Sequence, residues 1–288
     1  MRSTADTPSR SDIARVGFIG LGDMGGALVT RIIGAGFPTV LWARRRHVLT
    51  SFEEAGAEAV PTPADLAAGV DMVGICVWDD DAVRQVMNGP KGVLAGCRPG
   101  TVVAIHSTVL PATCRELATV AADRGVVVVD APVSGGRDVA LAGKLVVAVG
   151  GDQGTVARIG PVLASFGDPV IHVGRVGTGQ VAKLVNNNLL AANLALADDA
   201  LTLAEMLGIP DQEMGQVLRH GSGRSFALEV AIAGRTSAEI REQTAVPLSK
   251  DVRCLVEQAA PSECAEVALF TRAAQAGVQR VAAPMSKG

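Results

Sequence analysis

The chain has 288 residues, of which 48% are hydrophobic and 33 are glycine, and its formal net charge is −3. A chain of this size can bury a sizeable core and divide into two domains. The balanced charge gives no reason to expect binding to nucleic acid or to an anionic membrane, so a small-molecule partner is expected.

The N-terminal residues and the cysteines indicate where the protein works. Residues 1–13 are expected to form a short disordered tail, because they are mostly polar and lack the apolar segment of a secretory signal. No stretch of 18 apolar residues occurs, so no membrane-spanning helix is expected. Five scattered cysteines without a Cys-x-x-Cys pair argue for reduced thiols and against a zinc site. These features predict a cytoplasmic protein that binds no metal.

The first predicted strand, residues 14–19, runs into a glycine-rich turn and then into a predicted helix, residues 24–33. In this context Gly20 permits the turn, Gly22 lets the backbone approach a phosphate, and Gly25 lets the helix pack closely on the strand. The N–H groups at the helix start favour an anion such as pyrophosphate. We therefore predict a dinucleotide site here, although such turns also occur for packing alone. Its residues are Gly20, Leu21, Gly22, Asp23, Met24 and Gly25.

The second predicted strand, residues 39–42, ends where dinucleotide-binding domains distinguish NAD from NADP. Residues 38–51 contain no Asp or Glu that could bind the ribose 2′-hydroxyl of NAD. Arg44, Arg45 and Arg46 occupy this place instead, and guanidinium groups suit the 2′-phosphate of NADP. A solvated basic surface is the plainer alternative. We favour NADP bound by Arg44 and Arg45, with NAD possible.

Up to residue 173, short apolar β-rich segments alternate with segments of helical pattern. Residues 179–207 contain no helix breaker, which predicts one helix of about 28 residues, and the later elements are helical as well. The predicted fold class is α/β: a Rossmann-type doubly wound parallel sheet followed by an all-α C-terminal domain. The dinucleotide-binding domain is placed at residues 14–176, and the all-α substrate and dimerisation domain at residues 177–288. The other predicted strands are 72–77, 101–105, 126–131, 145–149 and 169–173, and the other predicted C-terminal helices are 211–220, 226–233, 248–259 and 263–276.

A strand end at Asp130 leads into the turn Ser134-Gly135-Gly136. The carboxyl ends of strands in a doubly wound sheet face the ligand site, where a hydroxyl and two backbone N–H groups could bind a carboxylate. Taken alone, the segment is more typical of an ordinary turn.

The long predicted helix is apolar on nearly every side and carries Lys183 near its start. A buried lysine must be paired, reach a cavity or lose its proton, and each makes it a candidate acid/base. Asn187 follows one turn later on the same face. Spacing alone leaves it equally open that Lys183 ends in solvent. The chain has no tyrosine, which excludes a dehydrogenase mechanism with a tyrosine hydroxyl as proton donor.

Several motifs in this order resemble the β-hydroxyacid dehydrogenase family, which includes 3-hydroxyisobutyrate dehydrogenase and tartronate semialdehyde reductase. The resemblance covers nearly the whole chain. It implies an NAD(P)-dependent 3-hydroxyacid dehydrogenase that forms dimers or tetramers through its helical domains. The motifs are residues 17–25, Ser107-Thr108, residues 130–136, residues 177–187 and Lys250-Asp251.

By this resemblance, Lys183 is the acid/base and Asn187 the second catalytic residue, while Thr108 lies near the nicotinamide. The implied reaction is reversible hydride transfer between NADP or NAD and a short 3-hydroxy acid such as 3-hydroxyisobutyrate. Lys250 is implied to close the substrate pocket. The implied substrate-binding residues are Ser134, Gly135, Gly136 and Lys250.

Three features depart from the family pattern and leave the substrate open. Arg31 stands where an asparagine is usual, His106 precedes Ser107 where a small or acidic residue is common, and residues 278–288 lack an acidic pattern. His106 is expected to be a satisfied structural histidine. Phe226 and its surroundings are candidates for setting substrate choice.

Three alternatives stay open. Imine reductases share the architecture but usually carry another residue at position 183, and 6-phosphogluconate dehydrogenases have a longer helical domain. A non-catalytic NADP-binding redox sensor is the third alternative, which an intact set of Lys183, Asn187 and Ser134 disfavours.

Overall fold

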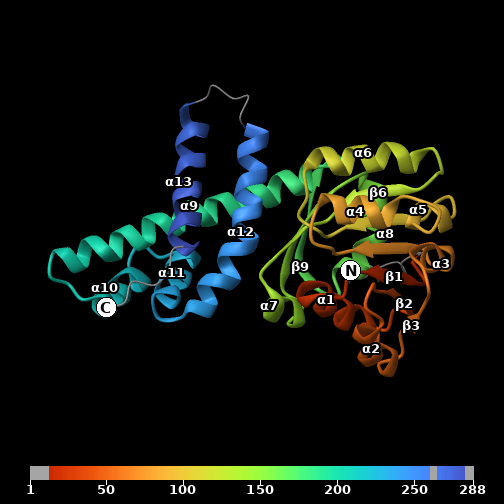
Figure 1. Cartoon of the computed structure of the whole chain (residues 1–288), viewed down its shortest axis with the longest axis horizontal. Helices are drawn as coiled ribbons and strands as arrows, with labels where there is room; N and C mark the ends of the chain where they lie inside the picture. The colour runs from red at the N-terminus through yellow and green to blue at the C-terminus, as the bar shows by residue number, and fades with distance from the viewer. Residues whose placement is uncertain (1–12, 260–264, 283–288) are drawn as a thin grey trace, which may run out of the picture. The chain divides into compact units, whose positions relative to one another are not determined.

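The structure is a computed structural model that describes residues 13–259 and 265–282 (Figure 1). It divides into two compact units: unit 1, residues 1–183, and unit 2, residues 184–288. The division falls inside a long helix, a few residues after the predicted boundary at residue 176. Most of the predicted N-terminal tail lies outside the described residues. The prediction is wrong for Ile13, because its apolar side chain is buried in the core of unit 1.

Unit 1 is built on a nine-stranded, mostly parallel sheet. Its strands are β1 Val16–Ile19, β2 Thr39–Trp42, β3 Glu58–Ala59, β4 Met72–Ile75, β5 Val102–Ile105, β6 Val127–Asp130, β7 Val133–Ser134, β8 Leu145–Gly150 and β9 Gly167–Gly174. Their order is β3-β2-β1-β4-β5-β6-β8-β7, with β9 beside β8. The first six strands of this order are those of a dinucleotide-binding fold, in which the order reverses between β1 and β4 and ligands bind beyond the carboxyl ends.

The helices of unit 1 connect these strands. They are α1 Asp23–Gly34, the 3₁₀-helix η1 Arg46–Leu49, α2 Thr50–Glu54, α3 Pro63–Ala68, α4 Asp80–Met87, α5 Val93–Gly96, α6 Pro111–Ala122, α7 Arg137–Leu141, α8 Gln153–Leu163 and the start of α9 Thr178–Met206. Thr62 caps the start of α3, because its hydroxyl accepts a hydrogen bond from the Asp65 N–H at 3.1 Å.

Successive residues of the central strands serve two different hydrophobic clusters. In β1, Phe18 belongs to one cluster and Ile19 to the other, and in β5 Ala104 and Ile105 divide in the same way. Since successive side chains of a strand point to opposite faces, both faces of the sheet are buried. This explains why the strands are continuous apolar segments in the sequence.

One part of the sheet differs from the predicted all-parallel arrangement. The short strand β7 lies in the segment predicted as a turn, and β8 runs antiparallel to both β6 and β7. The chain returns from β7 to β8 through the short helix α7, and a connection of this length suits antiparallel neighbours, since parallel strands need a longer crossover. The predicted α/β Rossmann-type class is confirmed.

The described residues of unit 2 form the rest of α9 and four further helices. These are α10 Asp211–His220, α11 Phe226–Thr236, α12 Ala238–Ala259 and α13 Ala265–Ala282. Figure 1 shows α12 and α13 side by side. A Cβ atom added at Gly277 of α13 would lie 1.7 Å from the Ala191 oxygen of α9, so glycine permits the close packing of these two helices.

The largest differences between predicted and observed helix boundaries lie in α12 and α13. The helix predicted from Leu248 begins at Ala238 and passes through Pro247. Proline removes one helical hydrogen bond, but the preceding residues include Ala, Glu, Arg and Gln, which are good helix formers. Residues 263–264 of the last predicted helix lie outside the described residues, and α13 continues to Ala282. Within the described part of the chain, the helices are all too short or too polar to cross a membrane.

Candidate active site

The glycine-rich turn after β1 has the geometry that its glycines predict. Gly20 has φ +97°, and a Cβ atom there would lie 2.1 Å from the Cys76 oxygen. A Cβ atom at Gly25 would lie 1.8 Å from the Gly20 oxygen, whereas one at Gly22 would meet no atom within 4 Å. Gly20 and Gly25 therefore permit a turn that larger residues would prevent, and Gly22 leaves open space beside the backbone.

The start of α1 fits the pyrophosphate of a dinucleotide. Gly22 is the N-cap, and among the described residues no side chain accepts a hydrogen bond from the first turn. Leu21 and Met24 turn their side chains toward the core, so the backbone N–H groups are what this turn offers an anion. The Asp23 carboxylate pairs with Arg137 Nε at 3.1 Å, a partner that the sequence does not predict. Cofactor binding by these residues stays a prediction.

The arginines after β2 are exposed. Arg46 pairs with Glu53 at 3.4 Å, whereas Arg44 and Arg45 form no ion pair with any described residue. Arg44 and Arg45 are thus available to an external anion.

The two tryptophans of the chain lie on either side of the strand that leads into the glycine turn. Trp42 ends β2 and donates from Nε1 to the Pro61 oxygen at 3.0 Å. Trp78 follows β4 and is 58% exposed. Since β1 lies between β2 and β4, the two tryptophans belong to segments at the carboxyl ends of the strands on either side of β1.

Lys183 and Ser134 are brought together, although they are 49 residues apart in sequence. Lys183 Nζ donates to Ser134 Oγ at 2.9 Å, and both side chains are half-buried. Gly135 and Gly136 have φ +141° and +82°, values that disfavour residues with a Cβ atom. A Cβ atom at Gly136 would meet no atom within 4 Å, so the backbone of this turn is approachable.

A buried carboxylate holds the start of α9. Asp130 accepts from the Gly177 N–H at 2.6 Å and from the Gln180 N–H at 2.8 Å. Burial raises the pKa of the Asp130 carboxyl, and these N–H donors oppose that rise. Asp130 thereby satisfies two N–H groups that a helix start leaves without partners.

A buried amide joins the same helix to the segment after β5. Gln180 Nε2 donates to the Ser107 oxygen at 2.8 Å, and Gln180 Oε1 accepts from the Val109 N–H at 3.1 Å. Thr108, predicted to lie near the nicotinamide, stands between these two contacts. The Ser107 hydroxyl accepts from the Val77 N–H at 2.8 Å, which adds the end of β4 to the group. Asp130 and Gln180 lie inside the family-like motifs, but their spacing gave no sign of these partners.

His106 is buried beside this group. Its Nδ1 lies 2.8 Å from the Ala131 oxygen and so carries the proton, while its ring stacks on Phe18 and meets Phe166 edge-on. Burial lowers the pKa of His106 to about 4. Its Nε2 has no hydrogen-bond partner among the described residues, so the predicted structural histidine is only partly satisfied.

Arg31, the other departure in this unit, donates from Nε to the Ser165 oxygen at 2.9 Å. It therefore ties α1 to the segment before β9.

In unit 2, Asn187 and Lys250 gather around Asp251. Asn187 Nδ2 donates to Asp251 Oδ2 at 2.6 Å, and Asn187 Oδ1 accepts from Asn186 Nδ2 at 3.0 Å. Lys250 Nζ lies 3.9 Å from Asp251 Oδ1. These contacts fix which way the Asn187 amide faces, a role for the buried Asp251 that the sequence did not reveal. Phe226 lies at the start of α11 with its ring mostly exposed.

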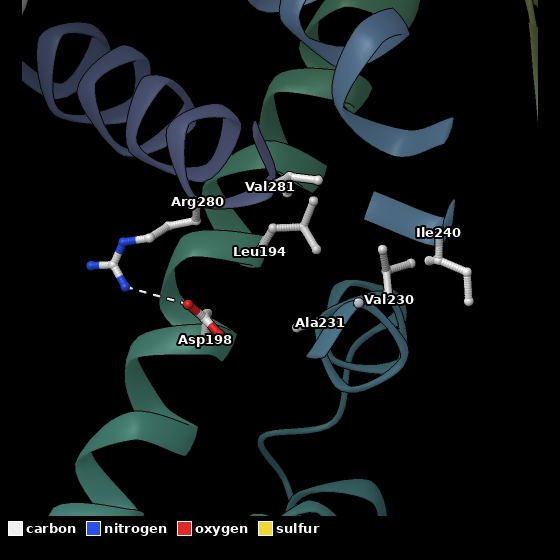
Figure 2. A pocket seen from close by; sticks show the side chains of 8 residues that line it. Leu194, Asp198, Val230, Ala231, Ile240, Arg280 and Val281 are labelled. Carbon is white, nitrogen blue, oxygen red and sulfur yellow. Dashed lines mark hydrogen bonds and ion pairs between the residues drawn. The ribbon is translucent and has the colours of Figure 1, made fainter. Parts of the chain in front are cut away.

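A small pocket in unit 2 is lined by none of the predicted site residues (Figure 2). Its lining is mostly apolar, and Arg280 pairs with Asp198 at 3.4 Å on one side. Its volume is about 30 Å³, far below the several hundred Å³ of an ordinary ligand site. It has room for little more than water. The lining residues are Leu194, Asp198, Val230, Ala231, Gly234, Ile240, Arg280 and Val281.

Known proteins resemble both units. Residues 15–174 match the family model described as the NAD binding domain of 6-phosphogluconate dehydrogenase. Residues 177–287 match the one described as NAD-binding of NADP-dependent 3-hydroxyisobutyrate dehydrogenase.

Individual relatives agree with these matches. The 2-(hydroxymethyl)glutarate dehydrogenase of Eubacterium barkeri is 37% identical over 215 residues, which are 75% of this chain and 71% of the relative. Human mitochondrial 3-hydroxyisobutyrate dehydrogenase is 34% identical over 212 residues, which are 74% of this chain and 63% of the relative. The solved structure of Mycobacterium tuberculosis 3-hydroxyisobutyrate dehydrogenase with L-serine has a TM-score of 0.81 at 26% identity, and 95% of each chain is covered.

Proposed function

This chain belongs to the family of NAD(P)-dependent hydroxyacid dehydrogenases that includes 3-hydroxyisobutyrate dehydrogenase, and we propose that it interconverts a short 3-hydroxy acid and its semialdehyde with NADP. The observation that carries this proposal is the 2.9 Å contact between Lys183 Nζ and Ser134 Oγ. It joins a proton-transfer group to a turn suited to a carboxylate.

Lys183 acts as the acid/base. In the oxidative direction the hydroxyl proton of the substrate passes to the Lys183 amine, and in the reductive direction the Lys183 ammonium returns it. When bound, the nicotinamide ring accepts or donates the hydride. A lysine also separates this chain from imine reductases, whose position 183 usually carries another residue.

The turn at Ser134 holds the substrate carboxylate. The Ser134 hydroxyl accepts from Lys183 and can donate its own proton to a carboxylate oxygen, while Gly136 leaves open space beside the backbone of the turn. Fixing the carboxylate in this way orients the reacting carbon, from which much of the rate gain of positioning arises. Asn187 and Lys250 keep the substrate-binding roles that the family resemblance implies.

NADP is the favoured cofactor. Arg44 and Arg45 are exposed and form no ion pair with a described residue, and no acidic side chain follows β2 until Glu53. Two guanidinium groups at this position support recognition of a 2′-phosphate.

A second copy of the chain covers part of α9. Leu189, Leu196 and Leu203 follow one another at intervals of seven residues, so they lie on one face of the helix, and each is more than half exposed. Such a stripe is typical of a helix that pairs, and we expect a dimer or a tetramer.

The test is Lys183→Ala, assayed with NADPH and a panel of short semialdehydes. Turnover should fall by about 10² to 10⁴, because a proton-transfer group is lost, while NADPH affinity stays within a few-fold. Lys144→Ala, which removes an exposed lysine of the same unit, is the matched control. Turnover of the Lys183 variant within tenfold of the parent protein would sink the assignment.

A further inference from the structure

Gln180 is an uncharged side chain that is fully buried and bonded at both ends of its amide. The amide bonds the main chain on both sides of Thr108, at the Ser107 oxygen and at the Val109 N–H. A buried main-chain carbonyl or N–H without a partner is costly, so these two hydrogen bonds stabilise the conformation of residues 107–109.

The same residue also belongs to the first turn of α9. Its N–H donates to Asp130, and the neighbouring Gly177 N–H does the same. Lys183 follows three residues later on this helix. Gln180 therefore connects the segment predicted to meet the nicotinamide with the helix turn that carries the amine predicted to transfer the proton.

The chemistry of the contact requires glutamine. One planar group must offer a donor to the Ser107 oxygen and an acceptor to the Val109 N–H. Methionine has a similar length and neither group, and asparagine has both groups but is one methylene shorter. Glutamate would set an oxygen against the Ser107 oxygen and add a charge beside the buried Asp130.

We propose that Gln180 is a positioning residue that fixes the distance between Thr108 and Lys183, so that hydride transfer and proton transfer are aligned. The proposal rests on the proposed function, because the alignment matters only if Lys183 is the acid/base. Positioning errors of about 1 Å can cost on the order of 10²-fold in rate, even though the displaced residue takes no part in the chemistry.

The experiment compares Gln180→Met with the parent protein in the full chain. We expect kcat to fall by about 10- to 100-fold while NADPH affinity and substrate KM change by less than about threefold. The primary isotope effect on kcat with 4-deuterated NADPH should rise, because the hydride step becomes slower than product release. Gln180→Asn should show the same pattern and serves where the methionine variant does not fold.

Thr39→Val is the control for the loss of a buried polar contact. The buried Thr39 hydroxyl donates to the Phe37 oxygen at 2.8 Å at the start of β2, and its loss should lower thermal stability without changing kcat or the isotope effect. A parent-like kcat and isotope effect in a folded Gln180 variant would overturn the proposal. A parallel loss of NADPH affinity would also overturn it, because Gln180 would then serve binding.

Hydrogen exchange separates this proposal from the proposed function. In Gln180→Met, exchange should increase both in residues 105–110 and in residues 178–184, because one side chain holds both segments. An increase in only one segment would contradict the proposal that Gln180 holds both segments. Suppose that exchange increases in both segments of the variant but the parent protein reduces no semialdehyde. Gln180 would then hold the two segments together, but the proposed function would be wrong. That result would also overturn the role of Gln180 in catalysis.

Discussion

In unit 1, large side chains are fully buried in both clusters of the sheet, such as Phe18 and Phe166 in one and Ile75 in the other, whereas alanine is the commonest residue in the core of the described part of unit 2. Several large apolar side chains of unit 2 lie on its surface instead. The exposed ones on α9 and in the turn after it include Leu189, Leu196, Leu203, Met206 and Leu207.

The difference shows two ways of using apolar residues. A sheet covered on both faces gives unit 1 a close-packed core, which holds its turns and buried polar groups in fixed positions. Small residues let the helices of unit 2 approach closely, as Gly277 does on Ala191, and leave the large side chains available to another surface. Unit 1 should therefore respond sharply to internal changes, and unit 2 to changes on its surface.

The largest effect is expected from Gly25→Ala. The added Cβ would lie 1.8 Å from the Gly20 oxygen, so the turn must move, and NADPH affinity should fall by at least roughly 100-fold with a marked loss of thermal stability. Gly26→Ala is the matched control, since its Cβ would find its nearest atom at 3.6 Å. Calorimetric titration with NADPH measures both variants. Similar affinities for the two would mean that the turn of unit 1 is not close-packed.

The second largest effect is expected in the pH dependence of the free energy of unfolding. Burial lowers the pKa of His106 to about 4, whereas an unfolded histidine titrates near 6.5, so between these values the unfolded chain binds more protons. The free energy of unfolding should therefore fall as pH falls through this range, by about 3 kcal/mol in total. His106→Gln should remove this part of the dependence in urea unfolding, and His47→Gln, at an exposed position, should not. An unchanged pH dependence in His106→Gln would show that His106 is not held neutral by the core.

The arginines after β2 test an exposed part of unit 1. Arg44→Ala combined with Arg45→Ala should weaken NADP binding by about 10- to 100-fold and leave NAD within about threefold, because charge-assisted hydrogen bonds to the 2′-phosphate are lost. Arg46→Ala is the control, since Arg46 already pairs with Glu53. A parent protein that prefers NAD would contradict the NADP assignment outright.

The smallest effect on folding is expected from Leu196→Asp. This residue is 62% exposed, so its replacement should leave unfolding nearly unchanged and yet convert the assembly into single chains of 29.4 kDa. Val120→Asp, on an exposed position of α6 in unit 1, should keep the parental mass. Light scattering at micromolar concentration distinguishes them. If both variants kept the mass of the parent protein, the exposed face of α9 would not differ from the exposed surface of α6 in its role in assembly.

The sequence predicted those parts of the molecule that depend on local chemistry. The glycines at 20, 22 and 25 indicated a turn, and the structure has it, because a backbone angle or a missing Cβ is a local property. The absence of a helix breaker between residues 179 and 207 predicted α9 to within a residue at each end. The family resemblance assigned Lys183 and Ser134 to one site, whereas spacing alone left it equally open that Lys183 ends in solvent. The direct contact between the two side chains was not predicted.

What the sequence did not predict depends on partners far along the chain. Gln180 bonds residues more than 70 positions away, and no periodicity marks a side chain whose partners are main-chain atoms. The antiparallel direction of β8 is likewise set by its neighbours β6 and β7 and not by its own composition. Ile13 was assigned to a tail because the residues before it are polar, while its burial is decided by the core of unit 1.

Trp42 and Trp78 give unit 1 an intrinsic fluorescence signal. The chain has two tryptophans and no tyrosine, and both tryptophans lie at or after the ends of strands that neighbour β1, so ultraviolet emission comes from unit 1 while unit 2 is silent. Reduced nicotinamide absorbs where indole emits, so NADPH bound at the glycine-rich turn after β1 should quench that emission. Unlabelled protein can thus show cofactor binding and the unfolding of unit 1 in the same signal, whereas circular dichroism reports the helices of both units together.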